Sequence, residues 1–296
     1  MTNWWMKESN ILVPSTLIKD IVYKLTSQAS VSLYPRYYEE LLKRLPEEDS
    51  PNAQWVLEQL LKNVEVAKRE NLPLCQDTGY VIVFIKIGKD ICLPENIQSS
   101  ADEGVRLAFN DSLLRASMVA HPFDRVNTKD NTPAIIHIEK GDIDGLEVDV
   151  MLKGAGSENA SALKMLSPSE GMQGVRRFIL QTLKKTAWNA CPPLVLGIGI
   201  GGTMEKSAYL AKKAILNWAK GREMDEWERS LLEDVNELGI GPGGVGGKLT
   251  CLGVGVETAP CHIATLPVAL NVQCYAMRIA GLRLSREDIL ASLNSV

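Results

Sequence analysis

The chain has no long run of apolar residues, and this absence limits what kind of protein it can be. No segment of its 296 residues approaches the ~18 continuous apolar residues of a membrane helix. The first residues, MTNWWMKESN, also have no apolar segment of the kind found in a secretory signal peptide. We therefore expect a cytoplasmic protein that has no membrane as its partner.

Positive charge is not in excess either. Lys and Arg number 32 against 36 Asp and Glu, and the formal net charge is −4. A general nucleic-acid binder needs a surplus of basic residues on one face, so the composition argues against that class. Hydrophobic residues make up 45% of the chain and charged residues 23%, which is ordinary for a globular protein with a substantial core.

Cysteine is scarce, with six residues and no CxxC pair. This excludes a disulfide framework and gives no support to a zinc knuckle, so the cysteines are expected to be thiols or ligands. Three lie in irregular, polar or turn-rich contexts: Cys75, Cys191 and Cys274. The others lie beside apolar residues or Pro: Cys92, Cys251 and Cys261. Because any single cysteine can be a small buried hydrophobe, composition alone does not select ligands among them.

Apolar spacing predicts helices in the first part of the chain, giving a helical N-terminal region of about residues 1–72. One apolar helix face is expected from residues at steps of four, four and three: Val56, Leu60, Val64 and Ala67. Further helices are expected over 101–119, with Leu113 and Leu114 facing inward, and over 169–189.

Strands are expected to alternate with helices farther along the chain. The apolar, β-branched run Tyr80–Ile87, which Gly88 ends, predicts a buried strand. The segments AIIHIEKGD and LEVDVMLKG predict two strands of a hairpin around GDIDG, and KGAGSEN then predicts a loop. No internal repeat or linker is visible in 1–296. We expect one domain of the α/β class (mixed α+β), with a helical N-terminal part followed by alternating strands and helices around a cleft.

Two glycine-rich segments raise the possibility of a nucleotide site. In LVLGIGIGGT, Gly197, Gly199 and Gly202 fit the pattern GxGxxG between a strand and a helix expected to begin near Thr203–Ser207. However, no GK[ST] follows, and the acidic residue expected ~20 residues later in a dinucleotide-binding unit is not clearly present. The alternative is that these glycines allow backbone to approach backbone or a small anion. The segment GPGGVGGK likewise has no Ser or Thr directly after its Lys, and the same alternative of close backbone approach holds for it.

Five segments, in this order, resemble one family over about residues 10–285. They are CQDTGYVIVFIKIG, KGAGSEN, ACPPLVLGIGIGGTMEKS, GIGPGGVGGK and CHIATLPVALNVQCYAMR. They are similar to the α-subunit, or N-terminal domain, of class I iron–sulfur hydro-lyases, which comprise oxygen-sensitive fumarate hydratases and L-tartrate dehydratases. The resemblance implies that Cys75, Cys191 and Cys274 hold a [4Fe–4S] cluster with one iron lacking a protein ligand. That open iron would act as a Lewis acid on the substrate.

The resemblance also implies roles for other residues of the site. Gln76 and Arg115 match residues that bind the substrate, and the planar guanidinium of an arginine suits a carboxylate. The backbone of Gly156 matches a position that touches substrate, although Ala155 interrupts the family's usual triple glycine. Asp77 and His262 match residues for hydrogen bonding or proton handling. Without the resemblance, Asp77 would be interpreted as a turn cap and His262 as a structural histidine.

The family's threonine base, further arginines and a lysine lie in a C-terminal domain, and this sequence stops where that domain would begin. We therefore expect a separate β-subunit, an α2β2 assembly, no activity of the α-chain alone, and a small dicarboxylate as substrate. Hydration of fumarate to L-malate, a reaction of the tricarboxylic acid cycle, is preferred because it is the commoner role.

Three alternatives remain open. The first is L-tartrate dehydratase, which shares the cluster residues with fumarate hydratase. The second is a nucleotide-binding module that contains no iron. The third is a non-catalytic iron–sulfur protein, which the joint presence of Gln76, Asp77, Arg115 and His262 argues against.

Overall fold

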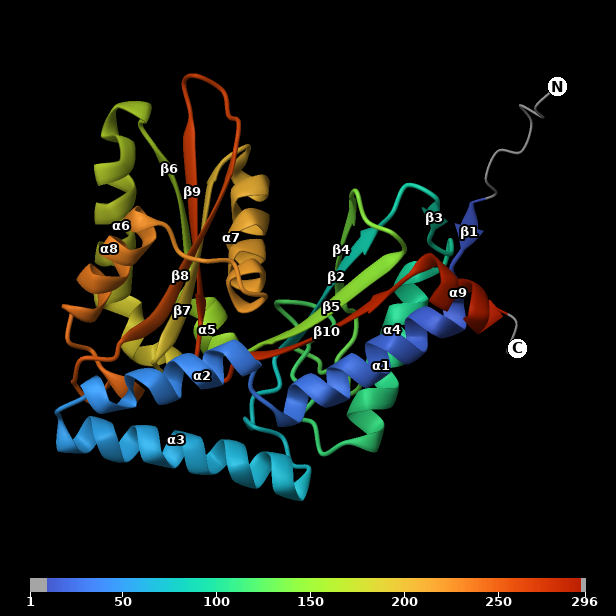
Figure 1. Cartoon of the computed structure of the whole chain (residues 1–296), viewed down its shortest axis with the longest axis horizontal. Coiled ribbons are helices and arrows are strands. Elements are labelled where there is room, and N and C mark those ends of the chain that lie inside the picture. Colours follow the sequence, from blue (N-terminus) through green and yellow to red (C-terminus); the bar gives the residue numbers. More distant parts are fainter. Residues whose placement is uncertain (1–9, 294–296) are drawn as a thin grey trace. The chain divides into compact units, whose positions relative to one another are not determined.

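The computed structural model describes residues 10–293, and the chain divides into two compact units (Figure 1). Unit 1 combines the N-terminal segment up to Ser32 with Ala67–Lys153 and the C-terminal segment from Arg278. Unit 2 combines Leu33–Val66 with Gly154–Met277. Because the segments of the two units interleave along the sequence, the expected single domain stays a prediction. In the described part of the chain, no helix has the length and apolar character to span a bilayer.

Unit 1 is built on a four-stranded sheet with the order β10-β5-β2-β4. The strands are β2 (Tyr80–Ile87), β4 (Ile135–Lys140), β5 (Leu146–Lys153) and β10 (Arg278–Leu284). Strand β2 lies inside the sheet and coincides with the predicted buried strand, because a short run of β-branched and aromatic residues suits a strand covered on both sides.

The predicted hairpin around GDIDG is wrong. Strand β2 lies between the two segments and pairs parallel with β4 and antiparallel with β5. The five-residue connection, residues 141–145, therefore passes over the end of β2 instead of closing a tight turn. Turn residues between two strands could not reveal that a third, more apolar strand occupies the space between them.

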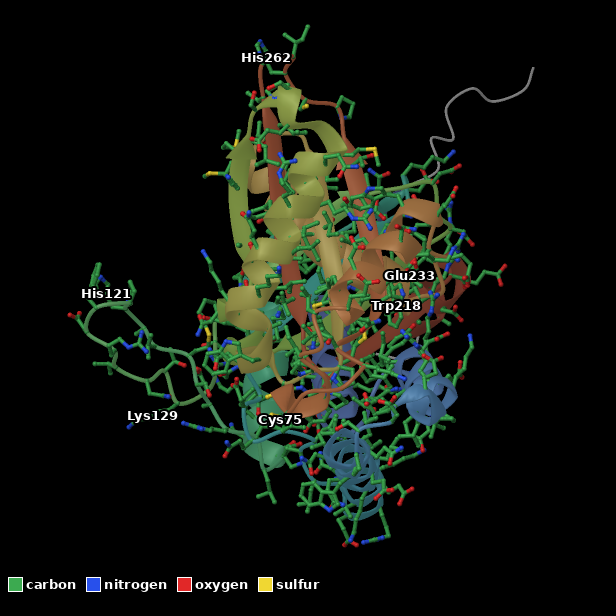
Figure 2. The ribbon with its side chains drawn as sticks, turned by 90° about the vertical axis from the view of Figure 1, so that its left-hand side faces the viewer. Cys75, His121, Lys129, Trp218, Glu233 and His262 are labelled. Atoms are coloured by element: carbon green, nitrogen blue, oxygen red, sulfur yellow. The ribbon has the colours of Figure 1, made fainter. Side chains whose placement is uncertain are left out.

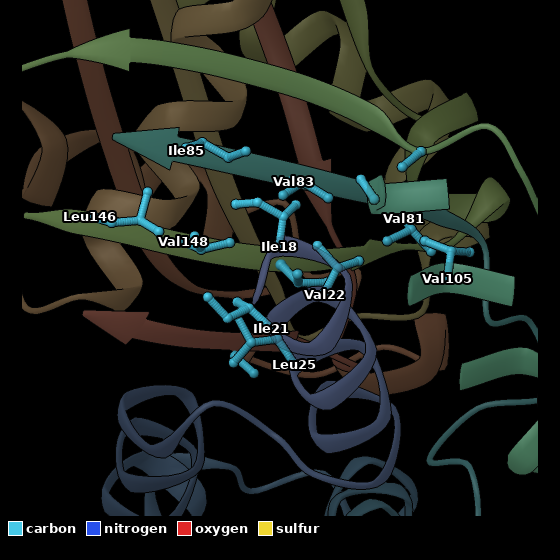
Figure 3. Packing of buried hydrophobic residues seen from close by; sticks show 14 of the residues in the cluster. Ile18, Ile21, Val22, Leu25, Val81, Val83, Ile85, Val105, Leu146 and Val148 are labelled. Atoms are coloured by element: carbon cyan, nitrogen blue, oxygen red, sulfur yellow. The ribbon is translucent and has the colours of Figure 1, made fainter. Parts of the chain in front are cut away.

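Aliphatic side chains form the core of unit 1. The helices are α1 (Ser15–Val31), α4 (Ile97–Asp111) and α9 (Arg286–Leu293), with a short parallel pair formed by β1 (Ile11–Leu12) and β3 (Ile91–Cys92). Figure 3 shows Ile18 and Val22 of α1 beside Val83 of β2 and Val148 of β5. Burial of such side chains contributes roughly 1.5–3 kcal/mol each to the free energy of unfolding.

The helix predicted over 101–119 ends earlier, at Asp111. Ser112 has an extended backbone, and the residues from 112 to 134 form a loop before β4. Leu113, expected to face inward, is 78% exposed. The poor helix formers Asn110, Asp111 and Ser112 favour such an end, because their side chains compete for backbone hydrogen bonds.

Unit 2 has a second four-stranded sheet, in the order β6-β9-β7-β8. Its strands are β6 (Ala162–Leu166), β7 (Leu194–Gly201), β8 (Cys251–Ala259) and β9 (Leu266–Gln273). Helix α7 (Met204–Ala219) packs on strands β7, β8 and β9, and Figure 1 shows α6 (Gly171–Thr186) and α8 (Glu226–Asn236) on the other side of this sheet. Strand β7 runs parallel to β8 and antiparallel to β9.

The remaining helical elements of unit 2 are shorter or lie early in the chain. They are α2 (Pro35–Arg44), η1 (Leu45–Glu47), α5 (Ala155–Asn159), η2 (Pro168–Glu170), η3 (Ala187–Ala190) and η4 (Pro242–Gly244). Helix α3 (Pro51–Glu70) contributes to both units. Its buried stripe consists of Ala53, Leu57, Val64 and Ala67, whereas Val56 and Leu60 are partly exposed. The KGAGSEN segment, expected as a loop, contains the short helix α5.

The glycines of GIGIGG lie mostly inside strand β7 and not in a loop before α7. A Cβ on Gly197 would lie 1.9 Å from the Ala211 carbonyl oxygen, and one on Gly199 would lie 1.9 Å from that of Ser207. These glycines therefore allow α7 to pack directly on β7, as the second interpretation of the segment expected. The mixed α/β class is confirmed.

Candidate active site

In unit 1, Cys75 lies on the bend between helix α3 and strand β2. The Leu74 N–H donates to the Ser30 carbonyl at 2.8 Å, which fixes this bend to the end of α1. Cys75 and Asp77 are half-buried and Gln76 is exposed, so these three residues form an accessible segment. Figure 2 marks the position of Cys75.

Arg115 lies in the loop that follows α4, not on a helix as expected. Its side chain is exposed. The loop is held by backbone hydrogen bonds, because the Thr128 N–H donates to the Met118 carbonyl at 2.9 Å and the Ala120 N–H donates to that of Val126 at 2.8 Å. Figure 2 shows His121 and Lys129 on this loop.

Asn131 connects the loop that carries Arg115 to the bend that carries Cys75. Its side-chain Oδ1 accepts the Ser117 N–H at 2.8 Å and the Met118 N–H at 3.2 Å, and its Nδ2 donates to the Gly79 carbonyl at 2.9 Å. The structure thus ties the neighbours of Arg115 to the QDTG turn within unit 1. No motif in the sequence singled out Asn131, although its place just before Thr132-Pro133 marks a constrained turn.

Buried basic residues lie at the end of the sheet where β2 begins. Lys153 pairs with Tyr80 in the sheet register, and Arg278 lies opposite Leu152, so both basic residues occur at this end. Both are almost fully buried. The Nε and Nη2 of Arg278 have no hydrogen-bond partner among the described residues. Buried donors without acceptors are costly, so this end of the sheet suits an anionic group.

In unit 2, Cys191 and Cys274 lie at the same end of the second sheet. Cys191 comes shortly before β7, and Cys274 directly follows β9. The two segments touch, because the Tyr275 N–H donates to the Cys191 carbonyl at 3.1 Å. Cys191 is exposed and has a left-handed backbone with φ of +51°, while Cys274 is half-buried.

Neighbouring side chains fix the backbone around both cysteines. The Tyr37 hydroxyl donates to the Pro193 carbonyl at 2.8 Å, and burial raises the pKa of Tyr37 well above its usual range, so the phenol stays a neutral donor. Gln273 is buried, and its Nε2 donates to the Ala276 carbonyl at 3.0 Å and lies 3.8 Å from the Cys274 Sγ. These contacts fix the short segment that carries Cys274.

The other cysteines differ in their surroundings. Cys251 is fully buried in the core of unit 2, and this burial raises its pKa to about 12. A thiol with such a pKa is a poor metal ligand, because the thiolate is the form that binds. Cys261 lies in the exposed connection between β8 and β9, and Cys92 lies in the short strand β3.

Gly156 lies near the segment that carries Cys191. A Cβ at Gly156 would lie 3.3 Å from the carbonyl oxygen of Asn189, two residues before that cysteine. Gly156 is exposed in the first turn of α5. Glu158 of this helix accepts two hydrogen bonds from Lys212, each 2.7 Å long, and one from Asn271 of β9 at 3.2 Å. Unit 2 therefore groups Gly156 with Cys191 and Cys274.

The structure does not bring His262 together with the cysteines of unit 2. It lies in the connection between β8 and β9, where Figure 2 shows it at the tip. Its Nδ1 accepts the Ala264 N–H at 3.2 Å, and its side chain is exposed. Cys274 follows the opposite end of β9, and a strand of eight residues spans roughly 23 Å at about 3.3 Å per step. The proton-handling role of His262 stays a prediction.

The three predicted thiol ligands fit an iron–sulfur cluster in their chemistry. The described residues contain no group of three His, Cys, Asp or Glu side chains gathered as ligands of a single metal ion. The predicted thiol ligands divide between the units, with Cys75 in unit 1 and the other two in unit 2. None of the three thiols is buried in an apolar core, and thiolates are the usual ligands of iron–sulfur clusters.

Comparison with known proteins gives one consistent result. The profile of the family described as "Fumarate hydratase (Fumerase)" matches residues 19–283. A protein of Methanocaldococcus jannaschii with the provisional name L(+)-tartrate dehydratase subunit alpha is 41% identical over 274 residues, which is 89% of this chain and 96% of the relative.

Two bacterial relatives carry the same name. The L(+)-tartrate dehydratase subunit alpha of Escherichia coli strain UTI89 is 33% identical, covering 98% of both chains. That of strain K12 is 34% identical, covering 92% of both chains. These matches cover nearly the whole chain, and the profile includes every predicted site residue. The chain therefore belongs to the fumarate hydratase (Fumerase) family.

Proposed function

We propose that this chain is the α-subunit of a hydro-lyase that removes water from a hydroxy-dicarboxylate, with L(+)-tartrate as the first candidate. The preference for fumarate drawn from the sequence gives way here, because the relatives at 33–41% identity are named for tartrate. The observation that carries the proposal is that the segments of Cys191 and Cys274, two thiols outside the core, are joined by a hydrogen bond from the Tyr275 N–H to the Cys191 carbonyl.

Cys75, Cys191 and Cys274 would be the thiolate ligands of a [4Fe–4S] cluster. When bound, such a cluster supplies an iron with no protein ligand, which is a Lewis acid for hydroxyl and carboxylate oxygens. Among the described cysteines, Cys251 is the least suitable ligand because its pKa is about 12. Superoxide or oxygen would inactivate the enzyme by removing the iron that no thiolate holds.

Residues of this chain would bind and orient the substrate. The exposed guanidinium of Arg115 is able to donate two parallel hydrogen bonds to a carboxylate. Gln76 would hold a second oxygen, and the Gly156 backbone would approach the substrate closely because no side chain intervenes. Asp77 would accept or hold a proton next to the cluster ligand Cys75. His262 is the least supported member of this set.

Dehydration also needs a base that removes a proton from a carbon next to a carboxylate. The printed names of the relatives call them alpha subunits, which supports a second chain as partner. We assign the base to that β-subunit and propose an α2β2 assembly with no turnover by the α-chain alone. The cytoplasm would be its location.

Serine replacements of individual cysteines test the ligand assignment. Cys191→Ser and Cys274→Ser should each lower the iron content of the anaerobically purified αβ complex and abolish turnover, because serine is a far weaker ligand for iron–sulfur clusters than thiolate. Cys261→Ser is the matched control, since its thiol is exposed but lies at the opposite end of β9. Full iron content and activity in Cys191→Ser would refute the cluster assignment.

A substrate comparison tests the finer proposal. The complex should release water faster from L(+)-tartrate than from L-malate, as measured by kcat/KM for each compound under anaerobic conditions. A complex that prefers malate would return the assignment to fumarate hydratase. A complex that contains iron and turns over neither compound would favour a non-catalytic iron–sulfur protein.

A further inference from the structure

Asn131 has an unusual combination of features for a loop residue. It is fully buried although it lies in a loop between α4 and β4 whose residues 120–127 are exposed. Its backbone has φ of +61°, a left-handed conformation that asparagine tolerates better than most residues. Its side chain makes three hydrogen bonds to backbone groups of two other segments.

These hydrogen bonds use both ends of the side-chain amide. The oxygen accepts from Ser117 and Met118, two and three residues after Arg115, and the nitrogen donates to Gly79, two residues after Asp77. The amide offers an acceptor and a donor in this arrangement, whereas a carboxylate has no N–H and an aliphatic chain has neither. Each backbone group left without its partner in a buried place would cost free energy.

Neighbours of Asn131 hold its position. The Asp130 Oδ2 accepts the Arg106 Nε–H at 3.2 Å, and its Oδ1 accepts the Thr132 hydroxyl at 2.8 Å and N–H at 3.1 Å. Arg106 belongs to helix α4. The turn that carries Asn131 is therefore fixed to the core of unit 1, so that its side chain can define the positions of the other two segments.

We propose that Asn131 is a positioning residue that sets the distance between Arg115 and the Cys75–Asp77 segment, and so the orientation in which these two segments hold the dicarboxylate. This inference rests on the proposed function, because Arg115 must hold one end of the substrate. A shift of about 1 Å between groups that hold a reacting molecule can lower a rate by about 100-fold. Asn131 acts through these segments and does not touch the substrate.

Two substitutions separate the halves of the amide. Asn131→Asp keeps the acceptor for Ser117 and Met118 but replaces the donor to Gly79 with a carboxylate oxygen. Asn131→Gly removes all three hydrogen bonds while glycine keeps the positive φ without strain. Lys129→Gly is the matched control, because Lys129 has φ of +69° in the same loop and its side chain is exposed.

The measurement is a double-mutant cycle on the reconstituted αβ complex. Asn131→Asp and Asn131→Gly should lower kcat/KM for the dicarboxylate about 10- to 100-fold in the parent, but less than about threefold in an Arg115→Ala background, because the residue they position is already missing. Iron content should match the parent in every variant. Hydrogen–deuterium exchange of residues 112–119 should rise in Asn131→Gly and stay unchanged in Lys129→Gly.

The outcomes distinguish this inference from the proposed function. If Asn131→Gly lowered kcat/KM by the same factor in the parent and in the Arg115→Ala background, its role would be generally structural and the inference would be overturned. The proposed hydro-lyase function would not be affected by that result. Unchanged kcat/KM in both Asn131 variants would overturn it as well. A parent complex that holds iron but dehydrates no dicarboxylate would refute the proposed function, and the inference with it.

Discussion

The two units hold the loops beside their cysteine segments with different chemistry. In unit 1, a neutral amide, Asn131, accepts two backbone N–H groups and donates to one carbonyl. In unit 2, a buried carboxylate, Glu48, accepts the backbone N–H groups of Lys248 at 2.7 Å, Leu249 at 3.0 Å and Ser50 at 3.1 Å. It also accepts the N–H of Asp49 at 3.2 Å.

The difference follows from what each loop offers. The GPGGVGGK loop presents backbone N–H groups that no strand pairs with, and concave runs of such groups attract an anion. The loops of unit 1 present both a carbonyl and N–H groups, so an amide satisfies them. The glycine loop reaches the cysteine segment directly, because the Gly243 N–H donates to the Pro192 carbonyl at 2.8 Å. We infer that removing Glu48 disturbs the surroundings of Cys191.

The largest effect is expected from removal of the buried carboxylate. Glu48→Ala leaves four backbone N–H groups without their acceptor and should lower the free energy of unfolding by about 4 kcal/mol. Glu48→Gln should cost about half as much, since its amide keeps one oxygen. Chemical denaturation of the purified α-chain measures both.

The control for this prediction is the neighbouring residue Glu47. It pairs with Arg44 at 3.0 Å, and 52% of its side chain is exposed, so Glu47→Gln should change stability by less than about 1 kcal/mol. If Glu48→Ala lowered the free energy of unfolding no more than Glu47→Gln, the Glu48 carboxylate would not hold its loop, and the contrast with Asn131 in unit 1 would be refuted.

A second contrast concerns how the sheets meet their helices. The central strand of unit 1, β2, contains no glycine and packs through aliphatic side chains, whereas β7 of unit 2 carries glycines against α7. Gly199→Ala should lower the free energy of unfolding by about 3 kcal/mol, because the added Cβ forces the helix away from the strand. The measurement is the shift of the denaturation midpoint.

Gly239→Ala provides the control for that comparison. No atom lies within 4 Å of a Cβ built there, and φ is +65°, so the expected cost is about 1–2 kcal/mol from backbone conformation alone. Equal costs at both glycines would mean that close packing on α7 adds nothing.

The smallest effect is expected from the charge beside Asn131. Burial acts to raise the pKa of the Asp130 carboxyl, but hydrogen bonds from Thr132 and the Arg106 guanidinium outweigh it and hold the pKa below its usual value. This carboxylate therefore stabilises unit 1 above its unfolded pKa of about 3.9, and the contribution is lost as the pH falls through the lower folded value.

Asp130→Asn makes this contribution measurable. At about pH 7 the substitution should lower the free energy of unfolding by about 1 kcal/mol, and the difference from the parent should shrink below about pH 4. Urea denaturation across this range reports it. A difference that stays constant down to about pH 2 would mean that the Asp130 charge contributes nothing to the stability of unit 1.

The sequence by itself determined the elements whose pattern is local. The β-branched run of β2 and the start of α7 at Met204 agree with prediction, because side-chain periodicity and turn residues act over a few positions. The motif resemblance likewise identified the family that the profile over 19–283 confirms. The exposed position of Leu113 escaped prediction, because an apolar residue after a helix looks the same as one within it.

The tertiary structure alone decided which segments lie together. It placed β2 between β4 and β5, and it moved His262 to the end of β9 opposite Cys274. It also separated the buried thiol of Cys251 from the accessible ones, and it joined Asn131 to Gly79 across 52 positions of sequence. Burial and hydrogen bonding depend on distance in space, and a single sequence records only distance along the chain.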